Sequence, residues 1–256
     1  MTKHMYEHFK NIEYLYGVNA SVQIPNGIFK DLSSSIKGKN GNTNIQQSSF
    51  AYTYLVTIAF LYKYAHFVDI DNYTYVQNAD VKQILGYGKT TKTIDKIIKK
   101  NGVLEELGLA KTTKDYPISF NNANEEYNEN RIREFTTIDM IDSDYVNHSI
   151  IKSIVKNRNY EIKEPTFLFE YKGETGSLYE YSNTHKITIK ELIRLIYDDS
   201  LDNIDFLMYG FFKSKCFNLK DNMKAIALCY IVLELGMGKD AFYTHLKVLK
   251  ENKFLE

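Results

Sequence analysis

Apolar residues recur at helical intervals in the first third of the chain. The recurring positions are Phe50, Tyr54, Ile58, Leu61 and Ala65. They predict a helix from about Ser49 to Phe67 that is apolar on most faces and therefore central to a core. Before it, Ser33 to Ser49 is rich in Ser, Gly, Asn and Lys without any period, which predicts a mobile loop. We expect a polar, irregular start and then a short extended segment, Val22 to Phe29, that ends in a turn.

A short strand and two helices follow this central helix. Tyr73 to Val76 is aromatic and β-branched, as strands are. Asn78 is a candidate cap for a helix from Ala79 to Leu85, which Gly86 ends. A further helix, Thr90 to Lys100, places three isoleucines on one side and four lysines elsewhere, and Asn101-Gly102 closes it.

The segment from Leu109 to Phe120 predicts a β-hairpin whose turn carries lysines. Helix, strand, helix, turn, helix and basic hairpin is the order of a winged helix-turn-helix. The fold class we predict is therefore mainly α with short β elements (α+β). A winged helix-turn-helix stands at the N-terminus, and a helical domain, a candidate second helix-turn-helix, at the C-terminus.

A polar stretch, Asn121 to Asn130, marks the predicted boundary. We expect a DNA-binding domain over 1–120, a connecting segment over 121–165 and a helical domain over 166–256. The predicted elements of the last part are a hairpin around Lys172 to Gly176, a helix from Thr188 to Asp198 opened by a Thr188/Glu191 capping box, and helices at Leu201 to Phe217, Lys220 to Leu235 and Lys239 to Glu251.

A short repeat relates the two halves. Leu85-Gly86-Tyr87-Gly88-Lys89 matches Leu235-Gly236-Met237-Gly238-Lys239, and each stretch precedes a predicted helix. A helix ended by glycine, a tight turn and a second helix with buried aliphatics describe a helix-turn-helix core. Duplication and convergence on the same pattern both explain the match. The second copy reaches Glu256, where a wing would begin.

Composition places the chain among folded globular proteins. It has 256 residues, 44% hydrophobic and 25% charged, which excludes collagen-like, coiled-coil and wholly disordered classes. The 32 basic residues balance 32 acidic ones, and only four of the basic residues are arginine. With many Asn, Ile and Tyr residues, this bias indicates an A/T-rich genome, that of a bacterium or one of its plasmids or phages.

The charge is distributed unevenly along the chain. Between Lys82 and Lys114, eight lysines stand against three acidic residues, whereas seven acidic residues between Glu125 and Asp144 stand against two arginines. A recognition helix needs short polar groups near its start for base edges and lysines along its exposed side for phosphates. The candidate DNA-binding residues are Lys89, Thr90, Thr91, Lys92, Thr93, Lys96, Lys99, Lys100, Lys111 and Lys114. In the second copy they are Lys239, Tyr243, Thr244, Lys247 and Lys250. A solvated lysine face is the alternative interpretation.

Other chemistry finds little support in the sequence. Gly88-Lys89-Thr90 lacks the upstream glycine of a phosphate-binding loop, and the six histidines show no metal-ligand spacing. Asp198, Asp199, Asp202 and Asp205 are expected to cap helices rather than bind a cation. We predict no catalytic residues, no metal site, no cofactor and no enzymatic activity.

Cellular context follows from the same residues. Cys216 and Cys229 are expected to be buried free thiols, which fits a reducing compartment. The start of the chain lacks the apolar stretch of a signal peptide, and no segment has the roughly 20 apolar residues of a membrane span. We expect a cytoplasmic protein without a membrane partner. The tyrosines of the central helix, Tyr52, Tyr54, Tyr62 and Tyr64, are expected in the core or an interface.

Several of these features together resemble a known family. They are Ile24-Pro25-Asn26-Gly27-Ile28-Phe29, the aromatic helix, the short strand and the helix pair that ends before Gly108-Leu109-Ala110. Over Val22 to Phe120 this pattern resembles the N-terminal winged-helix domain of plasmid replication initiators from low-GC Gram-positive bacteria. The resemblance implies binding to repeated origin DNA through the recognition helix and wing, often as a dimer. Two tandem units are also similar to another class of plasmid initiators.

Three hypotheses remain open at this point. The first is a sequence-specific double-stranded DNA-binding protein that initiates replication of a plasmid or mobile element, as a homodimer and with a host replication protein as a further partner. The second is a transcription regulator of the same element. The third is a protein-interaction module that does not bind DNA.

Overall fold

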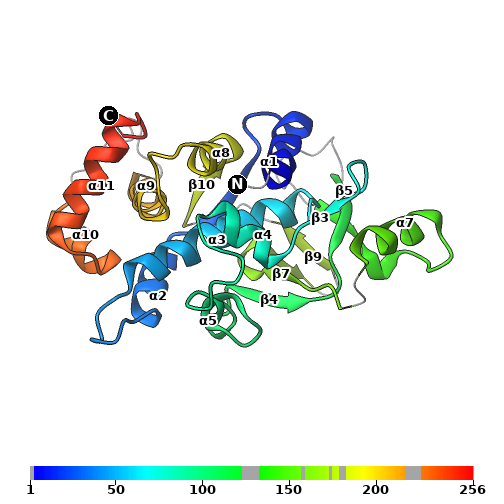
Figure 1. The fold of residues 1–256 in the computed structure, drawn as a ribbon, viewed down its shortest axis with the longest axis horizontal. Helices are drawn as coiled ribbons and strands as arrows, with labels where there is room; N and C mark the ends of the chain where they lie inside the picture. The colour runs from blue at the N-terminus through cyan, green and yellow to red at the C-terminus, as the bar shows by residue number, and fades with distance from the viewer. Residues whose placement is uncertain are drawn as a thin grey trace.

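A computed structural model describes residues 3–122, 133–156, 159–172, 175–178, 183–216 and 226–255. It is a mixed α and β structure in which helices surround short strands (Figure 1). The helices are α1 (Lys3–Tyr16), α2 (Ile28–Ser35), α3 (Ile45–Lys63), α4 (Asn78–Ile84), α5 (Asp95–Ile98), α6 (Val103–Glu106), α7 (Val146–Val155), α8 (Ile189–Tyr197), α9 (Asn203–Cys216), α10 (Leu228–Leu235) and α11 (Lys239–Glu251). Short 3₁₀ turns lie at Ile138–Met140 and Thr166–Leu168.

The strands pair two by two and antiparallel. The pairs are β1 (Ser21–Pro25) with β10 (Thr184–Thr188), β2 (Val68–Asp69) with β3 (Thr74–Tyr75), β4 (Ala110–Thr113) with β7 (Ile162–Pro165), β5 (Pro117–Asn122) with β6 (Arg133–Thr137), and β8 (Phe169–Lys172) with β9 (Thr175–Leu178). Two of the five pairs, β1 with β10 and β4 with β7, join segments that are far apart in the sequence.

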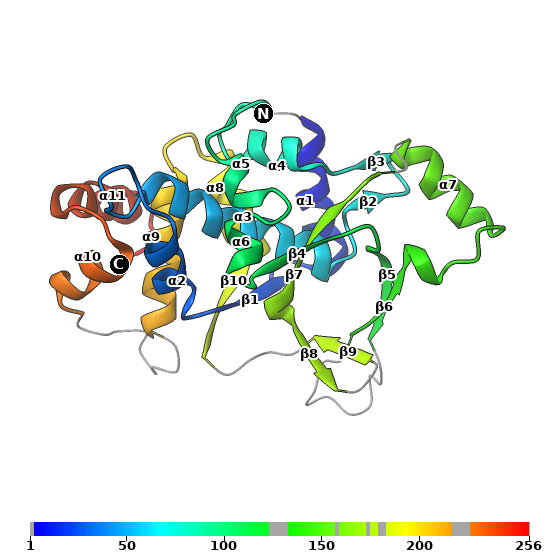
Figure 2. The same cartoon turned by 90° about the horizontal axis from the view of Figure 1, so that it is seen from below.

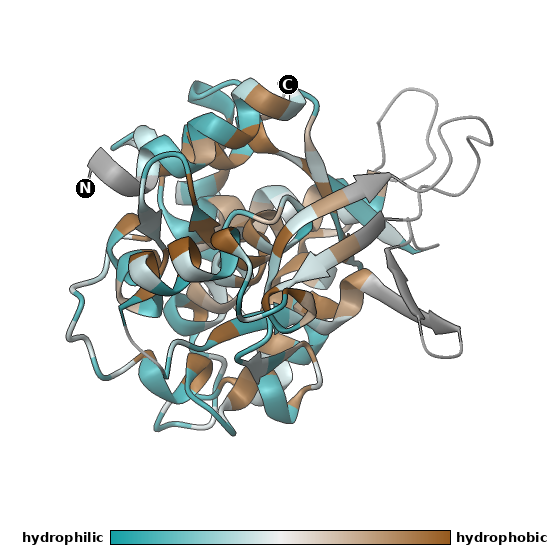
Figure 3. Cartoon of the chain, turned by 90° about the vertical axis from the view of Figure 1, so that its right-hand side faces the viewer, coloured by the Kyte–Doolittle hydropathy of each residue, from teal (hydrophilic) through white to brown (hydrophobic). Residues whose placement is uncertain are grey.

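Helix α3 is the centre of the core, as its all-round apolar sequence predicts. Every residue from Ser48 to Tyr62 is buried, and the four tyrosines expected inside are buried as well. The Asn44 side chain accepts a hydrogen bond from the Gln47 amide, so the helix begins four residues before the predicted start. A helix that is buried on all sides needs neighbours all round it; α2, α9, β1 and β7 supply them. In Figure 3 the apolar residues gather in the interior, and the outer turns of the helices are polar.

Contacts cross the predicted boundary between the halves. β1 pairs with β10 over five residues, from Ser21 opposite Thr188 to Pro25 opposite Thr184. Helix α3 packs along α9, and buried residues from both halves belong to one apolar cluster. Figure 2 shows β1 and β10 side by side, with α9 close to α3. The predicted segments 1–120 and 166–256 therefore share a core in the described part of the chain.

Two helices stand where the sequence predicted irregular structure. Phe9 and Ile12 of α1 are fully buried, so the polar N-terminal segment is an amphipathic helix and not an irregular start. In α2, Ile28, Phe29 and Leu32 face the core, and the helix continues into the serine-rich stretch to Ser35. The predicted loop over Ser33 to Ser49 is therefore limited to 36–44, which Lys37 and Thr43 close by a β-bridge.

The predicted wing is wrong in its pairing. β4 and β5 lie within Leu109 to Phe120, but they do not pair with each other: Lys111 of β4 stands opposite Glu164, and Phe120 of β5 stands opposite Phe135. The physical reason is the cross-strand side-chain pairs, which stabilise a sheet. Pairing with β7 gives β4 an oppositely charged partner, and pairing with β6 gives β5 an aromatic partner.

Other predicted elements agree with the structure. The Thr188/Glu191 capping box opens α8, α9 lies within the predicted Leu201 to Phe217, and α11 has the predicted limits. β8 and β9 form the predicted hairpin, although 173 and 174 lie outside the described residues. The helix predicted from Lys220 is described only from Leu228, and the predicted polar linker lies largely outside the described residues. None of the helices in the described ranges has the length and apolar character needed to cross a membrane.

Candidate nucleic-acid interface

The segment from α4 to α5, which carries the first set of lysines, packs against α3. The Asp80 carboxylate accepts the Gln77 amide at 3.0 Å, so Gln77 and not the predicted Asn78 precedes α4 as its cap. Gly86 has φ +83°, a conformation that favours glycine, and ends α4 as predicted. After the turn, Tyr87 packs edge-on against Phe50, with ring centroids 5.0 Å apart. The turn is thereby fixed to the core.

The predicted recognition helix is shorter than expected. Only Asp95–Ile98 is helical, and Thr90 to Ile94 are outside any helix, with turns at the two ends of this stretch. Buried Lys82 explains the difference: its ammonium donates to the carbonyls of Thr91, at 3.2 Å, and Lys89, at 3.5 Å, and it pairs with Asp95. These carbonyls accept hydrogen bonds from the buried ammonium group instead of from the backbone N–H groups of a helix. The three predicted core isoleucines, Ile94, Ile97 and Ile98, are buried as expected.

The other end of α5 is held as firmly. Asn101 has φ +55° and Gly102 follows it, as predicted for the end of this helix. A Cβ atom on Gly102 would lie 2.6 Å from the Lys96 carbonyl and 2.8 Å from that of Lys99, so no larger residue fits. The buried Lys163 ammonium also donates to the Lys99 carbonyl at 3.1 Å. Both ends of α5 are therefore anchored to the rest of the molecule.

Four lysines on this anchored segment point to solvent. Lys92, Lys96, Lys99 and Lys100 are exposed, and none of their ammonium groups has an ion pair or hydrogen bond with the described residues. We call these four residues the α5 lysine face. Thr90 and Thr93 are exposed beside it, and Thr91 is half-buried.

Two of the remaining lysines of the first set form ion pairs, and the third lies on the turn between β4 and β5. Lys89 pairs with Asp80 at 3.4 Å, and Lys111 pairs with Glu164 at 3.1 Å. Lys114 is exposed in the turn between β4 and β5. Because β4 pairs with β7, Lys111 and Lys114 do not form a lysine-bearing wing beside α5. Of the first set, the α5 lysine face is the group of exposed lysines that lie together on one segment.

The second set of predicted residues lies on α11. Gly236, with φ +64°, ends α10, and like Gly86 it has a positive φ. The two repeat copies differ after this glycine, because α11 begins at Lys239 whereas α5 begins only at Asp95. The buried side of α11 includes Phe242 and Leu249. The predicted contacts Lys239, Tyr243, Thr244, Lys247 and Lys250 are all exposed. Lys247 pairs with Glu251 at 3.7 Å. Helices α5 and α11 lie at separate places on the molecule (Figures 1 and 2).

An ion pair between buried Lys163 and half-buried Glu105, beside the end of α5, was not predicted from the sequence. Lys163 of β7 is buried and donates to Glu105 at 2.5 Å and to the Thr112 hydroxyl at 2.8 Å. Burial by itself would raise the pKa of Glu105, but hydrogen bonds from Lys163, Thr112 and the Asn101 amide outweigh it and lower the pKa to about 2. Only the pairing of β4 with β7 brings these groups together, and no local sequence signal predicts that pairing.

Two groups of residues in the described chain could each bring three metal-ligating atoms within 4.8 Å of one another. One is His8, His66 and Asp69, and the other is Asp202, Asp205 and His245. In the second group Asp202 accepts the Ile204 and Asp205 amides at 2.7 and 3.0 Å, and Asp205 accepts the Asp202 amide at 2.8 Å. These bonds cap α9, as predicted for the aspartates of this junction.

The cysteines differ from the prediction in their burial. Both are free thiols, but Cys216 is half-buried and Cys229 is exposed on α10. Apolar residues next to these cysteines in the sequence therefore do not bury both side chains.

Comparisons with protein-family models, with curated proteins and with solved structures found no match to this chain.

Proposed function

We propose that the protein binds double-stranded DNA through the α5 lysine face and acts as a replication initiator of a plasmid or mobile element. The observation that carries the proposal is the contrast among neighbouring lysines. Lys82, Lys89, Lys111 and Lys163 are all paired with carboxylates, whereas the four lysines of the face have no partner among the described residues.

Such a face has the properties that phosphate binding needs. Each lysine that neutralises a phosphate releases condensed counterions, and this release drives association even in a chain of zero net charge. Anchoring at Ile97, Ile98 and Gly102 fixes the backbone from which the lysines project, so little order has to be gained on binding. Thr90 and Thr93 beside the face are suited to base edges.

The exposed side of α11 is a candidate second contact, through Lys239, Tyr243, Thr244 and Lys250. α11 follows Gly236, which has a positive φ as Gly86 has in the first repeat copy. Since the two helices lie apart, a single DNA molecule would have to reach both along its length or bend around the protein.

Charge reversal on the α5 lysine face tests the proposal. The Lys92→Glu, Lys96→Glu, Lys99→Glu triple variant should lower the affinity for A/T-rich duplex DNA by at least about 100-fold, because three phosphate contacts become repulsive. Fluorescence anisotropy with labelled duplexes measures this. The matched control is Lys152→Glu, Lys186→Glu, Lys190→Glu, three exposed lysines of α7, β10 and α8, with the same change in net charge.

Equal loss of affinity in the two triple variants would contradict the site, because binding would then follow net charge alone. No binding by the unaltered protein at low salt would contradict DNA binding itself. Duplexes taken from within and upstream of the gene separate the two roles: preference for iterated repeats supports an initiator, and a single operator supports a regulator.

A further inference from the structure

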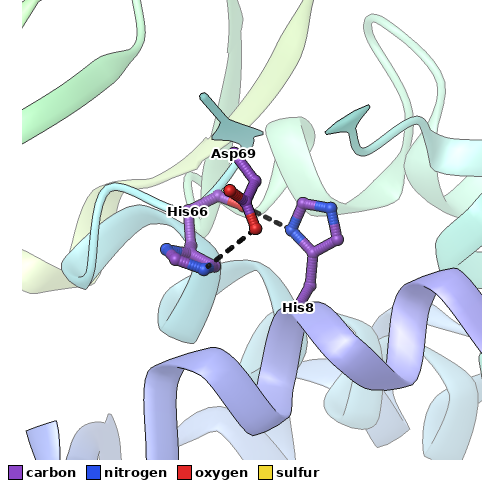
Figure 4. Close-up of side chains that lie close together, drawn as sticks. All are labelled: His8, His66 and Asp69. Atoms are coloured by element: carbon purple, nitrogen blue, oxygen red, sulfur yellow. Dashed lines mark hydrogen bonds and ion pairs between the residues drawn. The ribbon is translucent and has the colours of Figure 1, made fainter. Parts of the chain in front are cut away.

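Three titratable side chains from separate elements converge in the interior, away from the α5 lysine face. His8 of α1, His66 of the turn after α3, and Asp69 of β2 are only 1%, 8% and 6% exposed. Figure 4 shows the Asp69 carboxylate between the two imidazoles. The rings are nearly perpendicular, at 83°, with centroids 5.6 Å apart. Such a group is unusual in a core, because polar side chains buried together need partners.

The histidine of α1 is oriented by its neighbours. His8 Nε2 lies 2.8 Å from the Thr74 hydroxyl, and Nδ1 lies 3.3 Å from the His66 carbonyl and faces Asp69. A metal-binding imidazole commonly holds its second nitrogen in a hydrogen bond that sets the tautomer and the ring orientation. Thr74 is placed to do this for His8: with Nε2–H donating to the Thr74 hydroxyl, Nδ1 would exchange its 3.3 Å contact with the His66 carbonyl for a metal ion.

The carboxylate is oriented in the same way. Asp69 accepts the Asn11 amide group at 3.0 Å, the Asn72 amide group at 2.8 Å and the Asn72 backbone N–H at 3.1 Å. These donors come from α1 and from the turn between β2 and β3. Burial by itself would raise the pKa of Asp69, but the hydrogen bonds from Asn72 and the other partners lower it, so the group is an anion.

Within this cluster, His66 has a ring nitrogen that no described residue satisfies. Its Nε2 is buried without a hydrogen-bond partner, and the nearest carboxylate oxygen, Asp69 Oδ2, is 3.9 Å away. That separation is too long for a hydrogen bond. It is close to the roughly 3.3 Å between two ligand atoms on a tetrahedral ion with bonds of about 2.0 Å.

We infer that His8, His66 and Asp69 form a binding site for a divalent transition-metal ion of the zinc class. Two imidazoles and one carboxylate suit zinc, whereas calcium and magnesium prefer oxygen ligands in larger number. Water would complete a four-coordinate ion. The ligands come from α1, the turn after α3 and the β2–β3 hairpin, so the ion would fix the N-terminal helix to the hairpin that precedes α4.

Metal binding by the full chain without a polyhistidine tag tests the site. After chelator treatment and equilibrium dialysis against ZnCl₂, one zinc per chain should be retained, and the melting temperature should rise with zinc but not with MgCl₂. Asp69→Asn keeps the shape and volume of the side chain, and His66→Gln keeps a polar group. Loss of a ligand should weaken zinc binding by about 100-fold or more, since loss of a group that merely orients a ligand costs about 10- to 100-fold.

His245→Gln is the matched control, because it removes the histidine of the other His/Asp group and should leave zinc binding unchanged. Retention of zinc by both site variants, or its loss only in His245→Gln, would overturn the proposal. Failure of the unaltered protein to bind zinc would overturn it as well. Visible absorption of the Co²⁺-substituted protein gives a second readout: a tetrahedral spectrum that Asp69→Asn abolishes is expected, and an octahedral one would contradict the assigned ligands.

Discussion

At the scale of single residues, a buried histidine joins the two halves of the chain. His185 of β10 lies between the Tyr52 hydroxyl, 2.8 Å from Nε2, and the Asn26 side-chain oxygen, 3.0 Å from Nδ1. Because the Asn26 oxygen can only accept, Nδ1 carries the proton and Nε2 accepts from Tyr52. Burial lowers the pKa of His185 to about 3, with a smaller contribution from Lys213. The folded protein therefore holds this imidazole neutral.

His185 makes stability depend on pH in one direction. Between pH 6.5 and about 3 the unfolded chain binds a proton at this residue and the folded chain does not, so stability falls as the pH falls through this window and is unaffected above it. From pH 7 to pH 5 the loss should be about 2 kcal/mol. Urea denaturation at the two pH values measures it.

The comparison variant is His185→Asn, in which this part of the pH dependence should vanish although the protein is less stable throughout. His148→Asn, a half-buried histidine of α7, should behave like the unaltered chain. An equal loss of stability between pH 7 and pH 5 in His185→Asn and the unaltered chain would contradict the assignment.

At the scale of elements, the structure shows which sequence signals are sufficient. α8 and α11 were predictable because a capping box and a regular apolar period are local. α2 was missed because the serines after Leu32 concealed a helical spacing of Ile28, Phe29 and Leu32. The wing was mispredicted because the partner of β4 is β7, about fifty residues away, and the sequence carries no local mark of that pairing.

The candidate sites, too, could be predicted from the sequence only in part. The exposed lysines and buried isoleucines of α5 follow from their spacing along the chain. The shortening of α5 does not, since it depends on the burial of Lys82 under the turn it stabilises. The convergence of His8 with His66 and Asp69 depends on where α1 docks, and no spacing among the histidines indicates it.

The contact of α9 with α3 requires a glycine. A Cβ on Gly210 would overlap the ring and hydroxyl of Tyr52, which is held by its bond to His185. Gly210→Ala should therefore destabilise the protein by about 1–3 kcal/mol, the usual cost of overpacking a core. Gly27→Ala is the control, because its Cβ would meet only the Asp31 side chain at 3.9 Å. Thermal unfolding compares the two, and equal stability would refute the close packing of these helices.

At the scale of the whole molecule, the zero net charge hides a local difference between paired and unpaired lysines. Carboxylates near α5 pair with Lys82, Lys89, Lys111 and Lys163, whereas the four lysines of the α5 lysine face stay unpaired among the described residues. Under the proposal, attraction to DNA comes from that local face and not from the overall field of the protein. Its strength should depend on salt in proportion to the number of phosphates that the lysines meet.

The most direct measurement of this account is the salt dependence of DNA affinity. Anisotropy titrations between about 50 and 200 mM salt give the slope of log K against log salt concentration. For Lys92→Ala, Lys96→Ala, Lys99→Ala we predict a slope smaller in magnitude by about 3 than that of the unaltered protein, one for each lost phosphate contact. An unchanged slope would contradict the α5 lysine face as the DNA-binding surface.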